Sequence, residues 1–360
     1  MLWFNYAIIV CLILSLTAPY ISPNSFWIIA FFGLAYPIWL LLNLIFTVYW
    51  AMQMRWQLVF SLLTILLGFN TLTGYVQLRW GHSAVSNKDI KVMSYNSMLF
   101  DLYNWSKNAQ SRNLILNMLA EENPDILCLQ EFYNSDAVND FHNSDTLVHM
   151  LNAKNMHCEY TTTLRKVDHW GIATFTRFPV VRKGKIDFNV RSNNICIYTD
   201  VLIAKDTVRI YNMHLQSISF SKSDYKFMEA VNTQAEADDE VEHSKSILRR
   251  IKRAFIKRAT QADAVADHIK QCPYPVIVCG DFNDTPASYA YRTILGDLKD
   301  SFRESGSGFE QTYAGKFPRF RIDYILHGPQ YEAINYHKVS ETLTDHFPIV
   351  CYLRKAQPAP

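Results

Sequence analysis

The first 80 residues of this 360-residue chain contain no aspartate, glutamate or lysine, and their only charges are Arg55 and Arg79. A helix needs roughly 20 apolar residues to cross a bilayer, with a range of about 17 to 25. Three apolar stretches have suitable lengths: Leu2–Ala18, Phe26–Tyr49 and Trp56–Val76. The composition therefore predicts an N-terminal bundle of three transmembrane helices in residues 1–80. The alternative, a buried helical core, leaves the missing charges unexplained.

The rest of the chain lacks a strong net charge. The whole sequence has 35 basic and 33 acidic residues, and the first 80 residues hold two of the basic ones, so residues 81–360 carry 33 of each. This balance gives no general attraction to nucleic acid. The seven cysteines show no zinc-site spacing, and Cys128 and Cys279 fall in predicted core strands, so disulfides are neither required nor excluded.

The sparse charges also predict an orientation. Arg55 is the only charge between the second and third apolar stretches, and the positive-inside rule places it in the cytoplasm. Three crossings then predict a multi-pass protein that contacts the lipid bilayer through residues 2–76, with everything after Val76 extracytoplasmic. Arg79, Lys88 and Lys91 argue weakly for the reverse. A cleaved signal peptide is not expected, because no basic segment precedes the first stretch.

From Asp89 onward the pattern changes to strands interleaved with helices, which indicates an α/β domain. A helix is predicted from a cap at 104–106 to Glu122, with Leu114, Ile115, Met118 and Leu119 at helical spacing. The predicted strands are Ile90–Tyr95, Asp125–Gln130, Gly171–Thr176, Ile195–Ile203, Val208–Met213 and Val276–Cys279.

Residues 217–271 interrupt this pattern with a charged helical insertion. Glu236–Glu242 is acidic, and Lys245–Arg258 carries seven basic residues on an amphipathic helix expected to continue to His268. Two interpretations stay open for the basic helix. It is either a solvated helix packed on the sheet, or a contact for anionic lipid or a phosphate-bearing substrate.

The most informative stretch is Val276-Ile-Val-Cys-Gly-Asp-Phe-Asn283. A buried strand ends at Gly280, and Asp281 and Asn283 follow two positions apart, so an extended backbone points both side chains to one face. A carboxylate can hold a metal or accept a proton, and a carboxamide can donate to a phosphate oxygen. The alternative is an ordinary turn, since aspartate and asparagine both favour turns.

Five further segments combine an apolar strand with polar residues suited to phosphate or metal. They are Val92-Met-Ser-Tyr-Asn96, Ile126-Leu-Cys-Leu-Gln-Glu131, Tyr211-Asn-Met-His-Leu215, Arg321-Ile-Asp-Tyr-Ile-Leu326 and Thr344-Asp-His-Phe-Pro348. Each is weak alone. Together, and in this order, they resemble the endonuclease/exonuclease/phosphatase superfamily, a group that includes deoxyribonuclease I.

This resemblance covers the chain from about Ile90 to Leu353. It implies a four-layer α/β sandwich, in which two β-sheets pack face to face with helices outside. The expected organisation is three transmembrane helices in 1–80, a linker in 81–89, a catalytic domain in 90–355 that includes the insertion 217–271, and a disordered tail in 356–360.

The resemblance also implies roles for individual residues. Glu131 would be the principal Mg²⁺ ligand, with Asn96 and Asp345 completing the site, because a hard cation takes oxygen donors. Mn²⁺ would be a possible substitute. Asp281 would orient or deprotonate the attacking water. Donors to the phosphate would be Asn283, His214 and His346, with Asp323 holding His346 in its tautomer.

The function implied is a membrane-anchored, Mg²⁺-dependent hydrolase of phosphodiester or phosphomonoester bonds. The substrate class stays open between nucleic acid and a lipid or inositol phosphate, including a sphingomyelinase-like reaction on a lipid head group. His214 argues against abasic-site repair, because those members of the superfamily carry tyrosine there. An inactive domain that binds phosphate ligands, or an accessory domain beside a transporter-like or scaffold bundle, is the alternative. No protein partner can be inferred.

Overall fold

The computed structural model describes residues 1–79, 81, 83–138, 140–188, 193–218, 237–315 and 319–356, with backbone only for 237–243. The predicted tail lies almost wholly outside the described residues, as do the side chains of the acidic stretch. The chain divides into two compact units. The N-terminal unit comprises Met1–Gly68, Gln216–Asp263 and Ala287–Arg292, and the sheet unit comprises Phe69–Leu215, Ala264–Pro286 and Thr293–Pro360.

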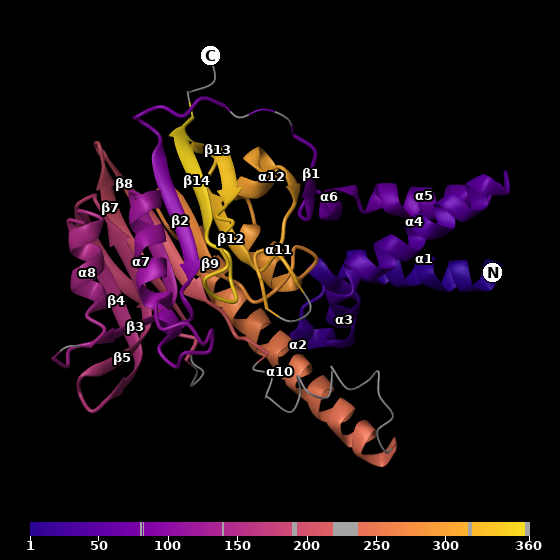
Figure 1. The fold of residues 1–360 in the computed structure, drawn as a ribbon. Coiled ribbons are helices and arrows are strands. Elements are labelled where there is room, and N and C mark those ends of the chain that lie inside the picture. Colours follow the sequence, from indigo (N-terminus) through magenta and orange to yellow (C-terminus); the bar gives the residue numbers. More distant parts are fainter. Residues whose placement is uncertain are drawn as a thin grey trace. The chain divides into compact units, whose positions relative to one another are not determined.

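The sheet unit contains two six-stranded sheets (Figure 1). The first has the order β13 (Tyr331–Lys338), β14 (Ile349–Lys355), β2 (Ile90–Asn96), β3 (Ile126–Ser135), β5 (Asp168–Thr176) and β4 (Asn155–Leu164). The second has the order β10 (Lys299–Asp300), β12 (Asp323–His327), β9 (Val276–Asp281), β8 (Asp206–His214), β7 (Ile195–Ile203) and β6 (Val180–Ile186). β2 runs parallel to β3 and β8 runs parallel to β9, whereas the other neighbours are antiparallel. A short ladder of β1 (Val76–Gln77) and β11 (Gly308–Phe309) stands apart.

The sheets pack face to face because their strands alternate. In β2, Val92 joins the cluster between the sheets, whereas Met93 faces the helices on the outer side. The second sheet contributes Ile210 and Cys279 to the same inner cluster. The expectation of two packed β-sheets with helices is therefore confirmed.

Helices cover the outer face of each sheet. α7 (Ser111–Glu122) packs on the first sheet through Ile115 and Leu119, and α8 (Asn143–Met150) adds Leu147 (Figure 1). The end of the long helix α10 (Ala237–Lys270) covers the second sheet, where His268 Nδ1 lies 2.8 Å from the Tyr211 hydroxyl. Two shorter helices occur later in the chain, α11 (Tyr289–Leu295) and α12 (Ser301–Ser305).

Helix α7 starts later than predicted. The sequence places its cap at 104–106, but the helix begins at Ser111. The preceding loop contains a short turn, η2 (Met98–Asp101), and several of its residues have positive φ, including Leu99, Asn104 and Lys107. A right-handed helix cannot include a left-handed backbone, so this loop delays the start.

The apolar part of the N-terminal unit consists of helices of unequal length. They are α1 (Leu2–Thr17) with a short turn η1 (Ala18–Tyr20), α2 (Pro23–Phe26), α3 (Ile28–Leu34), α4 (Tyr36–Met52) and α5 (Leu58–Leu67), followed in the other unit by α6 (Phe69–Leu72). Among the described residues, one helical segment, Leu2–Tyr20, is long and apolar enough to cross a bilayer. A core helix or a signal sequence passes the same test.

The prediction of three transmembrane helices is wrong, because the second and third apolar stretches do not each form one continuous helix. The second stretch breaks at Ala35 and bends by 61° between α3 and α4. Pro37 lies in the first turn of α4, where it starts a new helix because its missing N–H needs no partner there. In the third stretch, α5 ends at Leu67 after ten residues. The predicted extracytoplasmic side relied on three crossings, so it loses its basis.

Candidate active site

Strand pairing aligns three expected site residues across the second sheet. His214, the last residue of β8, pairs with Asp281 at the end of β9, and Asp281 pairs with Asp323 of β12. Asp323 begins its strand rather than ending it, because β12 runs antiparallel to β9. In β8 the inward positions run Val208, Ile210, then polar residues, so the alternation that builds the core also delivers His214 to the rim.

A close approach of backbones holds this row together. A Cβ atom on Gly280 would lie 2.2 Å from the Met213 carbonyl oxygen. Only glycine lets β8 and β9 lie this close immediately before Asp281. The glycine in the G-D-F-N motif therefore has a packing reason.

The first sheet contributes Asn96 and Glu131. Asn96 ends β2, and Glu131 sits in a bulge of β3, where the register to β5 shifts between Leu129 and Phe132. Glu131 has a φ of 46°, which is uncommon for a residue with a side chain. A bulge re-aims the side chain it carries, and the Glu131 carboxylate lies 3.8 Å from His214 Nε2.

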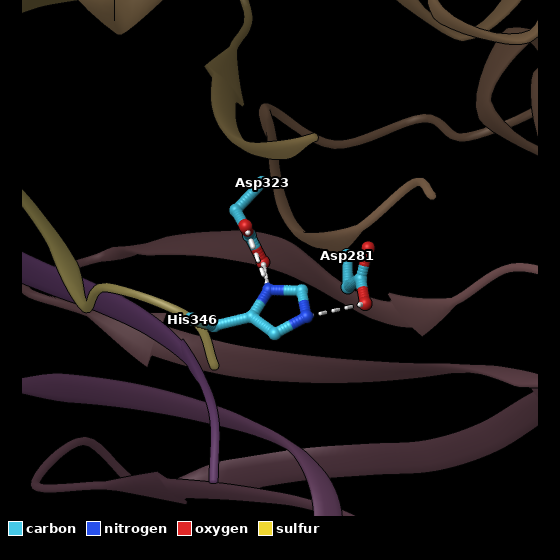
Figure 2. Close-up of side chains that lie close together, drawn as sticks. All are labelled: Asp281, Asp323 and His346. Atoms are coloured by element: carbon cyan, nitrogen blue, oxygen red, sulfur yellow. Dashed lines mark hydrogen bonds and ion pairs between the residues drawn. The ribbon is translucent and has the colours of Figure 1, made fainter. Parts of the chain in front are cut away.

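His346 lies in the segment that leads into β14. The Thr344 hydroxyl oxygen accepts the backbone N–H of His346 at 3.0 Å and donates to the Asn96 carbonyl at 3.1 Å, which ties the segment to β2. Figure 2 shows the imidazole between two carboxylates. Nδ1 lies 3.0 Å from Asp323, and Nε2 lies 3.7 Å from Asp281.

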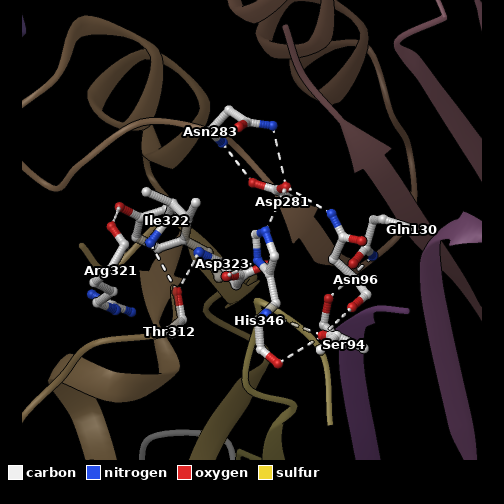
Figure 3. A network of polar contacts seen from close by, with 12 residues as sticks. Ser94, Asn96, Gln130, Asp281, Asn283, Thr312, Arg321, Ile322, Asp323 and His346 are labelled. Atoms are coloured by element: carbon white, nitrogen blue, oxygen red, sulfur yellow. Dashed lines mark hydrogen bonds and ion pairs between the residues drawn. The ribbon is translucent and has the colours of Figure 1, made fainter. Parts of the chain in front are cut away.

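Asp281 is the centre of this arrangement, and we call it, together with Asn96, His214, Asn283 and His346, the Asp281 cluster. Figure 3 shows Asn96, Asn283 and His346 around Asp281. Asn96 Nδ2 donates to its carboxylate at 3.1 Å, and His214 Nε2 lies 3.6 Å away. Asn283 donates twice, from its backbone N–H at 2.8 Å and from Nδ2 at 3.1 Å. Asp281 is 1% exposed, whereas the Glu131 side chain is 35% exposed, so the cluster opens on the Glu131 side.

The electrostatics of the cluster follow from this burial. Burial raises the pKa of Asp281; His346 opposes the shift, and Asp323 adds to it. Burial alone would lower the pKa of His346, but Asp323 and Asp281 outweigh it and raise that pKa well above the usual value. Burial also raises the pKa of Asp345, and Glu131 and Asp281 raise it further.

The carboxylates around Glu131 fit a divalent cation. Glu131 and Asp281 lie near enough to Asp345 for their charges to disfavour its ionised form, and a cation with oxygen ligands would relieve that repulsion. Asn96 could add its Oδ1, which also accepts the Met98 N–H at 3.1 Å. Asp281, Asp323 and His346 also form a compact possible ligand group. Because the two imidazole nitrogens face different carboxylates, one by a hydrogen bond to Asp323 and the other by an ion pair with Asp281, a chain of pairwise contacts describes this group better than one shared ion.

The structure accounts for the position of all eight expected site residues. It brings Asn96, Asp281, Asn283, His214 and His346 together, places Asp323 in hydrogen-bond reach of His346, and puts Glu131 beside His214. Asp345 neighbours Glu131 and Asp281 only through their charges. Asn283 turns back to Asp281 and to the Leu215 carbonyl at 3.0 Å. The catalytic and metal-binding roles of these residues stay predictions.

A buried polar bridge, which was not predicted from the sequence, lies beneath the cluster. Gln130 Nε2 donates to Asn212 Oδ1 at 2.8 Å, and Asn212 Nδ2 donates to the Ala173 carbonyl at 2.8 Å. The bridge joins β3 to β8. Gln130 directly precedes Glu131 in the chain, and Asn212 lies two residues before His214. A polar residue at an inward position of an apolar strand was the signal, in L-Q-E and in N-M-H-L.

A second missed feature supports Asp323. Arg321 is fully buried and makes a two-pronged pair with Asp300, at 2.6 and 2.8 Å. The Thr312 hydroxyl oxygen accepts the backbone N–H groups of Ile322 and Asp323, at 2.9 and 3.0 Å (Figure 3). These contacts position the start of β12, and the arginine of the R-I-D-Y motif was their only trace in the sequence.

Comparisons with known proteins agree with this geometry. The sequence model of the Endonuclease/Exonuclease/phosphatase family matches residues 93–346, and that of a domain of unknown function matches residues 1–75. No curated protein matches the chain.

Several solved structures share the fold. The human Nocturnin catalytic domain, with bound sulfate, has 19% identity and a TM-score of 0.53, covering 77% of this chain and 97% of its own. A mannosyl-6-phosphatase from Bacteroides thetaiotaomicron VPI-5482 has 18% identity and a TM-score of 0.52, covering 74% of this chain and 99% of its own. A humanized D. rerio TDP2 has 15% identity and a TM-score of 0.52, covering 75% of this chain and 100% of its own. At these identities the likeness concerns the fold alone.

Proposed function

The chain belongs to the endonuclease/exonuclease/phosphatase family, and we propose that it is a membrane-associated, Mg²⁺-dependent phosphoester hydrolase. Members of this family are generally phosphoester hydrolases. The observation that carries the proposal is the Asp281 cluster, in which a buried carboxylate lies 3.1 Å from two side-chain amides and 3.6 to 3.7 Å from two imidazoles of separate chain segments. Such a set can handle a proton and negative charge at the same place.

Asp281 is assigned to the attacking water. A general base works best when its pKa lies near the working pH, and burial raises the pKa of this carboxyl toward that range. The Asn283 and Asn96 amides that donate to Asp281 hold it in one rotamer. The water's proton would pass to Asp281 as the oxygen attacks phosphorus in line with the leaving oxygen.

His346 and His214 are assigned to the phosphate oxygens. The raised pKa of His346 keeps its imidazolium protonated, with Asp323 accepting from Nδ1, so Nε2 is the donor that faces the cluster. His214 Nε2 points to the same region, near both Asp281 and Glu131. Donors placed where charge grows in the transition state are the usual source of large rate effects.

Glu131 and Asp345, with Asn96, would hold the metal. When bound, Mg²⁺ neutralises the charge that develops on the phosphoryl oxygens. Mn²⁺ takes the same oxygen ligands and would serve in its place.

Among phosphoesters, a lipid is a candidate substrate that the exposed apolar surface of the N-terminal unit favours. Its helices expose large apolar side chains, including Trp3 at 83%, Leu41 at 58% and Leu67 at 76%. Exposed apolar surface of this kind marks contact with a membrane or another apolar partner. A hydrolase held at a bilayer meets lipid head groups at high local concentration.

A substrate screen tests the proposal. The full-length protein in neutral detergent would be incubated with DNA, RNA, a sugar phosphate, inositol phosphates and sphingomyelin, in Mg²⁺ or in chelator, beside Asp281→Asn. We expect Mg²⁺-dependent release of product from one class, lost in the variant. Turnover that survives both chelation and the substitution contradicts the mechanism. Binding of phosphate ligands without turnover would favour the inactive domain.

A further inference from the structure

A cavity of about 400 Å³ lies beside α10 within the N-terminal unit. Its volume is in the range of small-ligand sites, roughly 300 to 1,000 Å³. One wall is the chain segment at Gln216 and Ser217, and the other is the helix face that carries Arg249, Arg250, Arg253 and Lys257. None of these residues belongs to the Asp281 cluster.

The cavity gathers positive charge from a single helix. Arg249, Arg253 and Lys257 are spaced four residues apart and so share one face, with Arg250 beside them. Like charges at this spacing repel and weaken a helix. Among the described residues that line the cavity, none is acidic. Arg249 and Arg250 already have interaction partners in the chain, so an incoming anion would exchange contacts with them rather than meet free groups.

The wall opposite the helix is held in place. The backbone N–H of Gln216 donates to Gln261 Oε1 at 2.8 Å, and Arg258 Nη1 donates to the Gln216 carbonyl at 2.8 Å. Arg258 is 1% exposed, and its guanidinium lies 5.3 Å from the Phe255 ring. Both backbone polar groups of Gln216, its N–H and its carbonyl, are therefore bonded to side chains of α10. These bonds fix the segment that faces the four cations, so the cavity is formed before any ligand arrives.

The same stretch of α10 contacts the apolar helices of its unit. Phe255 packs edge-on against Phe31 of α3, with ring centroids 5.1 Å apart. The Lys252 ammonium lies 4.5 Å from the centre of the Trp27 ring. Tryptophan and lysine together are typical of the membrane–water boundary, where apolar and ionic groups meet.

We propose that this cavity binds a phosphate-bearing anion through Arg249, Arg250, Arg253 and Lys257. Guanidinium groups match phosphate oxygens in a two-pronged geometry, and a basic cavity attached to apolar helices suits the head group of an anionic phospholipid. A free phosphate or phosphoester has the same recognition chemistry. The site does not rest on the proposed hydrolysis.

The test measures binding in chelator, where the proposed hydrolysis cannot contribute. Full-length protein in neutral detergent would be titrated with inorganic phosphate, and separately with the same micelles containing phosphatidylglycerol. The test variant is Arg249→Gln/Arg253→Gln. The matched control is Lys245→Gln/Lys270→Gln, which removes two exposed cations of the same helix that do not line the cavity.

We expect the arginine variant to bind phosphatidylglycerol micelles roughly 30-fold more weakly than the parent, on the scale of about 1 kcal/mol for each cation near an anionic surface. The control should stay within about threefold. If binding of inorganic phosphate is lost in parallel, the cavity accepts free phosphate. If the variant loses affinity only for phosphatidylglycerol micelles, the cavity binds the phosphate as part of a lipid head group. Equal binding by parent, control and arginine variant, all with the same circular dichroism, would overturn the proposal.

Discussion

Both units bury polar groups, but in opposite ways. In the N-terminal unit, Asn5 is fully buried, donates to the Ser61 hydroxyl at 2.9 Å and accepts the Trp50 indole N–H at 2.9 Å. These bonds join α1, α4 and α5. In the sheet unit, Asp281 is equally buried, yet it faces two imidazoles and two further carboxylates.

The difference shows what each cluster is suited to do. The Asn5 contacts are neutral and mutually satisfied, so they hold helices together without inviting a ligand. The Asp281 cluster carries charge whose pKa values are displaced by burial and by neighbours, and such displacement concentrates at functional sites. Three perturbations would separate these two uses of buried polarity, and a fourth tests an ion pair outside both clusters.

The largest effect is expected from Asp281→Asn. Loss of a positioned base should lower kcat by about 10² to 10⁴, and the melting temperature should change little, because burial already disfavours the charged carboxyl. Steady-state kinetics and thermal melting measure both. Asp206→Asn, an exposed carboxylate at the start of β8, is the control. A kcat within tenfold of the parent would show that Asp281 is structural.

The second perturbation is Glu131→Gln, which keeps the side-chain shape and removes its charge. We expect the Mg²⁺ concentration for half-maximal activity to rise at least about tenfold, the scale seen for partners of metal ligands, with activity partly restored by excess Mg²⁺. Glu332→Gln, exposed on β13, should leave the Mg²⁺ curve unchanged. Identical Mg²⁺ curves for Glu131→Gln and the parent would exclude Glu131 as a ligand.

The third perturbation acts on the neutral cluster. Asn5→Leu leaves the Trp50 indole and the Ser61 hydroxyl without their partner, which should cost about 1 to 2 kcal/mol of unfolding free energy and spare kcat. Melting in detergent, followed by tryptophan fluorescence, measures it. A double-mutant cycle with Ser61→Ala should show coupling. Strict additivity would mean that the hydrogen bond contributes nothing.

The smallest effect is a pH dependence far from either cluster. His337, whose Nε2 lies 3.8 Å from the Glu122 carboxylate, and the ion pair with Lys91 lower the pKa of Glu122 from 4.5 to about 2, against the opposing effect of burial. A lowered carboxyl pKa stabilises the fold above 4.5 and loses that contribution as pH falls toward 2. Glu122 in turn raises the pKa of His337, so the stability that this interaction adds is present below pH 6.5 and is lost as pH rises through the raised value.

Stability should therefore be greatest between about pH 4.5 and 6.5 as far as this pair is concerned. The side chains are 22% and 36% exposed, and solvent screening reduces the expected effect to about 1 kcal/mol. Denaturant melts across this range measure it, and Glu122→Gln should flatten the profile. A profile that keeps its shape in the variant would assign the dependence to other groups.

The sequence by itself determined several central strands of both sheets and the family. Alternating apolar residues predicted β7 with its observed bounds, because side-chain direction has a period of two along any strand. They also located β2, β3, β5, β8 and β9 with ends displaced by up to five residues, whereas β4, β6, β13 and β14 were not predicted. It also predicted the residues that meet around Asp281, since their motifs are short and local. The same local reasoning failed in the first 80 residues. Composition reports how apolar a segment is, but not where a helix breaks at Ala35 or Gly68.

Only the tertiary structure decided how the motifs fit together. Register placed His214, Asp281 and Asp323 side by side, and strand direction made Asp323 the start of its strand. The bulge at Glu131 and the bridge from Gln130 to Asn212 depend on residues from different strands. The contacts of Gln216 depend on Arg258 and Gln261 of α10, more than 40 positions away in the chain. Such contacts depend on packing between segments far apart in the chain, so no local pattern encodes them.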